Sequence, residues 1–232
     1  MLGDAVLVAP VLEAGKSTVD FYMPLETDGK RSVWYDSRTL VRVAPKDHSD
    51  EWAVLAAPLS SIPVLYRGGR IIVTQQRARK ATSGMTADPY TAVACLRDNA
   101  ASGDVYIDDG ATFKFLNGTY VYRKLAVQMT LPSASGVPGQ LVFTSTAATV
   151  PSIVDAPAHK PEAVANNVLD SVHVLGFPRG VVAGKATVTT AAGVTRAVSI
   201  TVVAETNVLL IQSADMLVSD ELTVTIELTN SD

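Results

Sequence analysis

The sequence predicts an all-β protein made of two β-sandwich domains in series, with antiparallel sheets. Short apolar runs, many of them β-branched, recur along the chain and are separated by glycine, proline and aspartate. No long segment has the helical period of apolar residues. A charged stretch with small residues, 77–84, interrupts the β pattern. We therefore expect a proximal domain over residues 1–80 and a distal domain over 81–232.

Composition limits the classes of protein that the chain can represent. Its 232 residues are 47% hydrophobic, which supports a large core and argues against disorder. The net charge of −4 is too small to indicate a nucleic-acid or membrane partner, and no aromatic residues interleave with the basic run at 77–80. The apolar run 5–12 is too short for a membrane span, and no basic signal-peptide region precedes it. A chain cut from a larger precursor would also lack its signal.

Six strands are predicted in the proximal domain, each bounded by turn residues. Their ranges are 5–10, 17–23, 33–35, 51–56, 62–66 and 71–73. The first is so apolar that we expect it to be buried on both faces. Gly68-Gly69 joins the last two strands, and a bulge that separates Arg67 from Arg70 is expected there because a plain hairpin would place these two charges opposite each other. A phosphate-binding glycine loop is disfavoured, since no helix follows.

The distal domain shows the same pattern over a longer stretch. Its predicted strands cover 90–96, 104–107, 112–116, 119–128, 141–144, 172–175, 186–190, 194–203, 208–211 and 222–228. Residues 160–168 are the one candidate for a short helix, with Pro161 in its first turn. Asn117-Gly118 predicts a two-residue hairpin turn that pairs Phe115 with Tyr120 and Phe113 with Tyr122. Such an aromatic stripe is more often core than a sugar-binding platform.

The acidic residues Asp104, Asp108 and Asp109 are the most suggestive candidates for chemistry. Neighbouring strand residues point to opposite faces, so Asp108 and Asp109 do not flank a single glycosidic bond easily. A turn stabilised by Asp side chains and Gly110 is the favoured interpretation, and a cation site is the alternative. We predict no catalytic residue, no metal site and no cofactor in this chain.

Three further residue types carry weaker signals. His48, His159 and His173 are scattered without metal-ligand spacing. Cys95 lies in an apolar run and is expected to be a buried free thiol. Asn117-Gly118-Thr119 is a candidate N-glycosylation site, which has meaning only if the chain passes through the secretory pathway.

Several phrases, in order along the chain, resemble the C-terminal β-domains of family 31 glycoside hydrolases, the α-glucosidases and their relatives. They are Gly3-Asp4-Ala5-Val6-Leu7-Val8-Ala9-Pro10-Val11, Tyr22-Met23-Pro24, Trp34-Tyr35-Asp36, Ala57-Pro58-Leu59 with Ile62-Pro63, Arg67-Gly68-Gly69, and Val105-Tyr106-Ile107-Asp108-Asp109-Gly110. Arg77-Ala78-Arg79-Lys80, Met85 and Asp88-Pro89-Tyr90 are similar to the endoplasmic-reticulum branch of the family. The chain departs from the family at Val73-Thr74, where relatives tend to carry proline.

This resemblance implies a parent enzyme that removes α-linked glucose from N-linked glycans by a retaining mechanism, in the lumen of the endoplasmic reticulum. The family's catalytic residues lie in a (β/α)8 barrel that ends just before Gly3-Asp4, so none of them can be placed on this chain. The implied role is to brace that barrel and to pack beside the N-terminal domain. A noncatalytic β subunit is a further candidate partner.

The alternative hypothesis is a free-standing carbohydrate-binding or adhesion module. It requires an exposed aromatic platform, for which Trp34, Tyr35 and Trp52 are the candidates. Core positions are the favoured interpretation for all three.

Overall fold

The computed structural model describes residues 1–46, 51–150, 167–213 and 216–231. Within these ranges the protein is all-β, and its two short helices are 3-10 turns, η1 (Thr82–Met85) and η2 (Lys114–Asn117). No helix in the described ranges has the length and apolar character needed to cross a membrane. The predicted all-β class is confirmed, but the predicted helix over 160–168 falls almost entirely outside the described residues.

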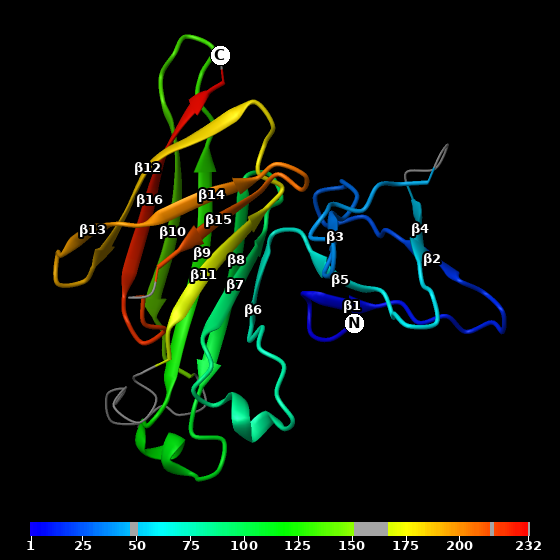
Figure 1. Cartoon of the computed structure of the whole chain (residues 1–232), viewed down its shortest axis with the longest axis horizontal. Helices are drawn as coiled ribbons and strands as arrows, with labels where there is room; N and C mark the ends of the chain where they lie inside the picture. Colours follow the sequence, from blue (N-terminus) through cyan, green and yellow to red (C-terminus); the bar gives the residue numbers. More distant parts are fainter. Residues whose placement is uncertain (47–50, 151–166, 214–215, 232) are drawn as a thin grey trace.

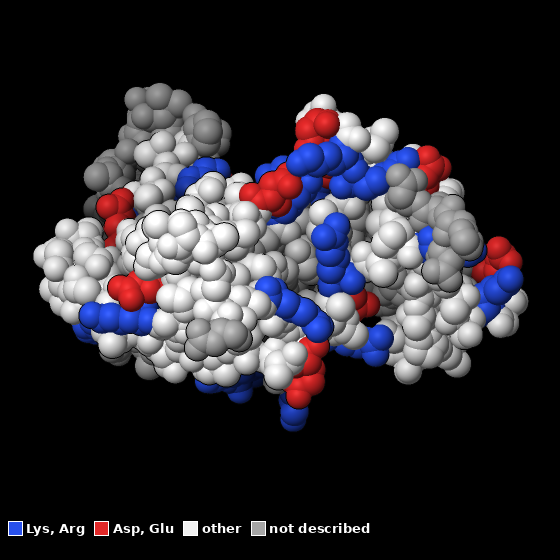
Figure 2. Space-filling view, turned by 90° about the horizontal axis from the view of Figure 1, so that it is seen from above, with Lys and Arg blue, Asp and Glu red and all other residues white. Residues whose placement is uncertain are grey.

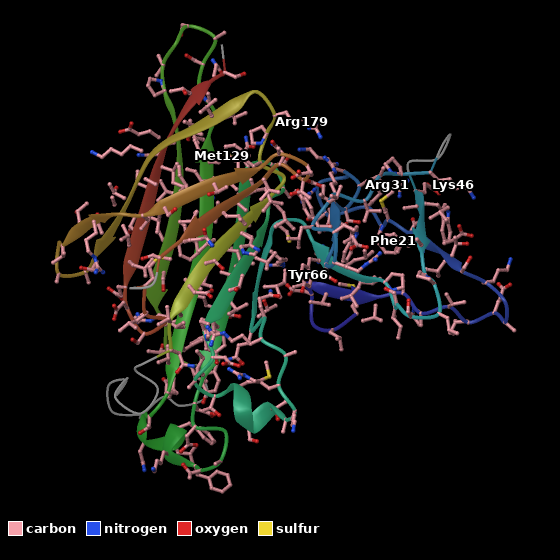
Figure 3. All side chains as sticks on the ribbon, viewed as in Figure 1. Phe21, Arg31, Lys46, Tyr66, Met129 and Arg179 are labelled. Carbon is pink, nitrogen blue, oxygen red and sulfur yellow. The ribbon has the colours of Figure 1, made fainter. Side chains whose placement is uncertain are left out.

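The proximal part contains two small sheets. The first has the order β1-β5-β3, with β1 (Val6–Val8), β5 (Val64–Arg67) and β3 (Trp34–Asp36). The second pairs β2 (Thr18–Tyr22) with β4 (Trp52–Ala56). Their shared core contains Phe21 and Trp34, whose rings meet edge to face at 5.5 Å, packed with Leu55 and Leu65. Figure 3 shows Phe21 inside this part of the molecule.

One sheet of 11 strands forms the rest of the described chain. Its order is β13-β12-β16-β10-β9-β8-β6-β7-β11-β15-β14. The bounds are β6 (Arg70–Thr74), β7 (Tyr90–Cys95), β8 (Ala100–Ile107), β9 (Val121–Thr130), β10 (Gly139–Ala147), β11 (Leu169–Leu175), β12 (Val181–Thr190), β13 (Thr195–Ala197), β14 (Ser199–Val203), β15 (Val208–Gln212) and β16 (Leu222–Asn230).

This large sheet curls until its two edges meet. The edge strands β13 and β14 are separated in the chain by Val198 alone, so the sheet is nearly closed around one core (Figure 1). Alternate residues of each strand point into that core, as Leu125, Val127 and Met129 of β9 do. The two expected sandwiches are not clearly formed, because one curled sheet makes up most of the described chain. The expectation of purely antiparallel sheets is wrong, because β6–β8 and β7–β11 are parallel pairs.

The change from the small sheets to the large sheet occurs at Gly68-Gly69. β5 pairs within the proximal sheet, whereas β6 enters the large sheet between β7 and β8. The bulge predicted at this pair is wrong, because β5 and β6 are not partners, but the two guanidiniums do separate: Arg67 pairs with Glu26 and Arg70 with Asp4. The predicted boundary between two folding units at residues 80/81 stays a prediction. In the structure β6, which precedes that boundary, already belongs to the large sheet.

The predicted strand over 112–116 and the hairpin at Asn117-Gly118 are also wrong. Instead β8 and β9 form an antiparallel pair, and a long loop, 108–120, joins them. The carboxylate of Asp109 accepts the backbone N–H groups of Ala111 and Thr112 and directs the chain into η2. Gly118, with φ +82°, then ends η2 in the left-handed conformation. The glycine thus serves a helix end instead of a hairpin.

Candidate functional site

The outer face of the β1–β5 pair is an apolar strip. In this register Leu7 and Leu65 point to the proximal core, whereas Val8 and its cross-strand neighbour Val64 point outward. Val8 is 40% exposed, and Ile62, in the connection before β5, is 63% exposed. The expectation that the first strand is buried on both faces is therefore not met within this chain. The strip is open to a partner.

Exposed apolar side chains are concentrated in the proximal part more generally. Among the described residues, more than half of the large hydrophobic residues that are exposed lie before residue 73, although this region is less than a third of the chain. They are Met1, Leu2, Val8, Leu12, Tyr22, Leu25, Val41, Trp52, Val54, Leu59 and Ile62. The proximal part therefore exposes a larger share of apolar side chains than the rest of the described chain.

Backbone hydrogen bonds connect the proximal part to the large sheet. The N–H of Gly68 donates to Val33 O and that of Gly69 donates to Cys95 O, each at 2.7 Å. Gly69 has φ +83°, a conformation that favours glycine. Gly103 of β8 allows β6 to approach, because a Cβ there would lie 2.3 Å from Ile71 O. The joint between the two parts, at Gly68-Gly69, is thus held by backbone hydrogen bonds to both of them.

A small buried cluster fills the same joint from both sides. Tyr35 of the proximal part packs with Val93, Cys95, Leu175 and Val208 of the large sheet. Tyr66 joins this cluster, and Figure 3 shows it where the two parts meet. Burial raises the pKa of Tyr35 to about 12, so its hydroxyl stays protonated and able to donate. The two parts share a core and are not connected by a simple linker.

Two ion pairs connect the proximal part with the large sheet, and we call them the clasp. In one pair the basic residue comes from the large sheet, and in the other it comes from the proximal part. Arg97 Nη2 lies 2.5 Å from Asp28 Oδ2, and Lys30 Nζ lies 3.2 Å from Asp98 Oδ2. Arg97 and Asp98 belong to the tight turn between β7 and β8, in which Asp98 and Asn99 have positive φ. This turn was not predicted from the sequence. Asp98-Asn99 would have indicated it, because both residue types tolerate the left-handed conformation.

The candidate acidic residues all serve local structure. Asp104 accepts from the Tyr122 hydroxyl and Lys124 Nζ, both at 2.8 Å, and Lys124 lowers its pKa. Asp108 accepts from the N–H of Gly110 at 2.8 Å. The hydroxyl and N–H of Thr112 are the main causes that lower the pKa of Asp109 to about 2. A general acid needs a raised pKa, so neither Asp104 nor Asp109 is suited to that role. The expected Asp hydrogen bond and the positive φ of Gly110 are present, but the hairpin turn expected here is wrong, because no strand follows at 112–116.

The other candidate residues do not come together. His48 and His159 lie outside the described residues, and His173 of β11 has a pKa lowered by burial. Cys95 is fully buried, as expected, and burial raises the pKa of its thiol. Across the described ranges no group of His, Cys, Asp and Glu is arranged to hold a metal ion. Asn117 is exposed at the end of η2.

The aromatic candidates divide between core and surface. Trp34 and Tyr35 are buried, as expected, but Trp52 is 43% exposed. Trp52 lies opposite Tyr22 on the β2–β4 pair, with ring centroids 5.2 Å apart and planes inclined by 59°.

Comparison with known proteins assigns the proximal part directly. Residues 1–72 match the family model described as the glycosyl hydrolase family 31 C-terminal domain. The chain carries the C-terminal domain region of glycosyl hydrolase family 31. It is 36% identical to mouse neutral alpha-glucosidase AB over 168 residues, which are 71% of this chain and 17% of that protein. It is 38% identical to a probable glucan 1,3-alpha-glucosidase of Arabidopsis thaliana over 126 residues, 53% of this chain and 13% of that protein.

Solved structures are similar to this chain over the large sheet as well as over the proximal part. The structure titled glucosidase II alpha subunit, alpha3-Glc2-bound, superposes with a TM-score of 0.72 and 24% identity, covering 94% of this chain and 22% of its own. A Flavobacterium johnsoniae family 31 dextranase has a TM-score of 0.64 and 14% identity, covering all of this chain and 26% of its own. At these identities the likeness shows the shared fold. The chain thus spans between about a fifth and a quarter of the length of these solved structures.

Proposed function

We propose that the chain is the non-catalytic C-terminal portion of a family 31 α-glucosidase of the glucosidase II type. In this role it braces a catalytic (β/α)8 barrel and packs beside an N-terminal domain, and the whole enzyme trims α-linked glucose from N-glycans in the endoplasmic reticulum. The observation that carries the proposal is the open apolar strip on β1 and β5, in the part that matches the family 31 domain. A strand of this composition is suited to a position between two neighbours.

The joint supports a bracing role, because the clasp and the shared cluster around Tyr35 hold the proximal part against the large sheet. The proximal part can then contact the barrel through one of its sides while the large sheet stabilises it from another. A partner subunit is a further element of the proposal. One related solved structure is titled as an ER glucosidase II heterodimer of the catalytic subunit with the binding domain of a regulatory subunit.

An assay of the purified chain tests the non-catalytic part of the proposal. Retaining glycosidases need two carboxyl groups about 5 Å apart, one of them with a raised pKa. We expect no release of 4-nitrophenol from its α-glucoside above the rate in buffer. Sustained turnover that disappears in Asp108→Asn or Asp109→Asn would contradict the proposal, because each of these carboxylates is assigned here to a loop turn.

The second candidate, a carbohydrate-binding module, is favoured by the exposed Tyr22–Trp52 pair. The inclination of 59° between the rings is unsuited to a flat platform for one sugar face. Titration with an α-glucan oligosaccharide separates the two functions, because Trp52 is exposed and Trp34 is buried. The bracing proposal predicts unchanged tryptophan fluorescence. A saturable change that is lost in Trp52→Ala and kept in Tyr106→Ala would favour the module.

A further inference from the structure

A cleft of about 560 Å³ lies beside the clasp, between the proximal part and the large sheet. Its walls come from both parts of the chain: Lys30, Arg31, Val33, Tyr35, Arg42, Leu96, Arg97, Asp98, Asn99 and Gly176. Four of these residues are basic and one is acidic. Figure 2 shows basic side chains gathered along the groove between the two lobes. The cleft therefore concentrates positive charge at one place on a protein whose net charge is −4.

A second cleft, lined by residues of β6, β8 and β9 with Asp4 and Ala5, gives a useful contrast. It has a volume of about 400 Å³ and is lined by two acidic and two basic residues. These residues pair with each other, Arg70 with Asp4 at 2.6 Å and Lys124 with Asp104 at 2.8 Å. The charges of that cleft are balanced within it, so it offers no net attraction to an ion.

The charges of the first cleft are not balanced in the same way. Arg97 pairs with Asp28, Lys30 with Asp98, and Arg31 with Glu51 at 2.6 Å. Arg42 has no acidic partner among the described residues. It is exposed and lines the cleft, and it lies near enough to Tyr35 to act on the pKa of that phenol. One guanidinium is thus available, and the other three basic residues of the cleft are each engaged in an ion pair.

From this arrangement we infer that the cleft binds a small phosphate- or sulfate-type oxyanion, with Arg42 as the principal ligand. A guanidinium binds such oxyanions through two parallel N–H···O bonds, which an ammonium cannot provide. Lys30 and Arg97 are held in the ion pairs of the clasp and place further N–H donors in the same cleft. Because the ligand would contact residues of both parts, its binding would strengthen the joint. This inference does not depend on the activity proposed for the parent enzyme.

Titration of the whole chain with inorganic pyrophosphate tests the inference. Binding is measured by calorimetry, and the backbone amide resonances of Asn99 and Gly176 report on the cleft. Sodium chloride at matched ionic strength controls for screening. The matched control variant is Arg38→Gln, since Arg38 is exposed in a nearby turn and does not line the cleft.

We expect saturable binding that Arg42→Gln weakens about tenfold or more, because it removes a charge-assisted pair of hydrogen bonds. Arg42→Lys should retain part of the affinity, and Arg38→Gln should retain all of it. Equal loss in Arg38→Gln, wild-type affinity in Arg42→Gln, or no saturable binding by the wild-type chain would each overturn the inference. Thermal melts of the variants distinguish a lost site from a lost fold.

Discussion

The hydroxyl of Tyr35 donates a hydrogen bond to the backbone oxygen of Leu96 at 2.7 Å, and this bond joins the proximal part to the large sheet. The same hydroxyl lies over Gly176, where a Cβ would come within 2.2 Å of the phenolic oxygen. Tyr35 is 3% exposed, so its bond and its packing are both buried. The joint thus depends on one tyrosine and on a glycine that leaves room for it.

Tyr35→Phe should therefore lower the free energy of unfolding by about 1 kcal/mol, the usual contribution of one buried hydrogen bond. Gly176→Ala should cost more, because it adds the clash and places alanine at φ +79°. The two changes should not be additive, since removing the phenolic oxygen relieves part of the clash. Urea denaturation of the single and double variants measures the coupling. Strict additivity would contradict the contact between these residues.

Arg123 lies on the inward face of β9 and is 4% exposed. Its Nη1 is 3.7 Å from Glu221 Oε1, and its Nε and Nη1 have no hydrogen-bond partner among the described residues. Arg123→Met should therefore leave stability unchanged or raise it by about 1 to 2 kcal/mol, because a poorly paired buried charge is removed. Arg38→Met, at an exposed site, is the control. A large loss of stability in Arg123→Met alone would show that the guanidinium is well paired.

Asp88 accepts two hydrogen bonds from Arg79, at 2.8 and 2.5 Å, and this pairing lowers the pKa of its carboxyl. A carboxyl whose pKa is lower in the folded state than its unfolded value of about 4 stabilises the fold at pH values above about 4. This stabilisation is lost as the pH falls through the folded-state pKa. Asp88→Asn should be less stable than the wild type near neutral pH, and the difference should shrink below about pH 4. Denaturation across this range measures it, with the exposed Asp20→Asn as control. A difference that is independent of pH would contradict the ion pair.

The apolar strip on β1 and β5 should make the isolated chain self-associate. Val8→Glu places a charge on this strip and should shift the chain toward the monomer. Val182→Glu is the matched control, because Val182 is 46% exposed on β12 of the large sheet. Light scattering as a function of concentration gives the comparison. A wild-type chain that stays strictly monomeric would count against an uncovered interface.

The strand positions were largely predictable because they depend on local patterns of apolar and turn residues. The partners of those strands were not. Gly68-Gly69 has the composition of a hairpin, yet the tertiary contacts of Val33 and Cys95 place the two strands in different sheets. At Asn117-Gly118 the side chain of Asp109 redirects the chain before the expected turn.

The site was less predictable than the fold, since the clasp and the cleft join residues that are far apart in the sequence. Asp28 and Arg97 are brought together only when β6 inserts between β7 and β8. No local spacing encodes that contact. The family resemblance, in contrast, was readable in short phrases such as Arg67-Gly68-Gly69, whose glycines are required by the joint.

The bracing role is tested most directly by co-expression with mouse neutral alpha-glucosidase AB that lacks its matching C-terminal region. The mouse protein's own C-terminal region, supplied as a separate chain, is the positive control. We predict that residues 1–232 co-purify with the truncated enzyme and increase its soluble α-glucosidase activity, and that Val8→Glu weakens both effects while Val182→Glu does not. Failure of the wild-type chain to associate, under conditions in which the mouse region does, would contradict the account.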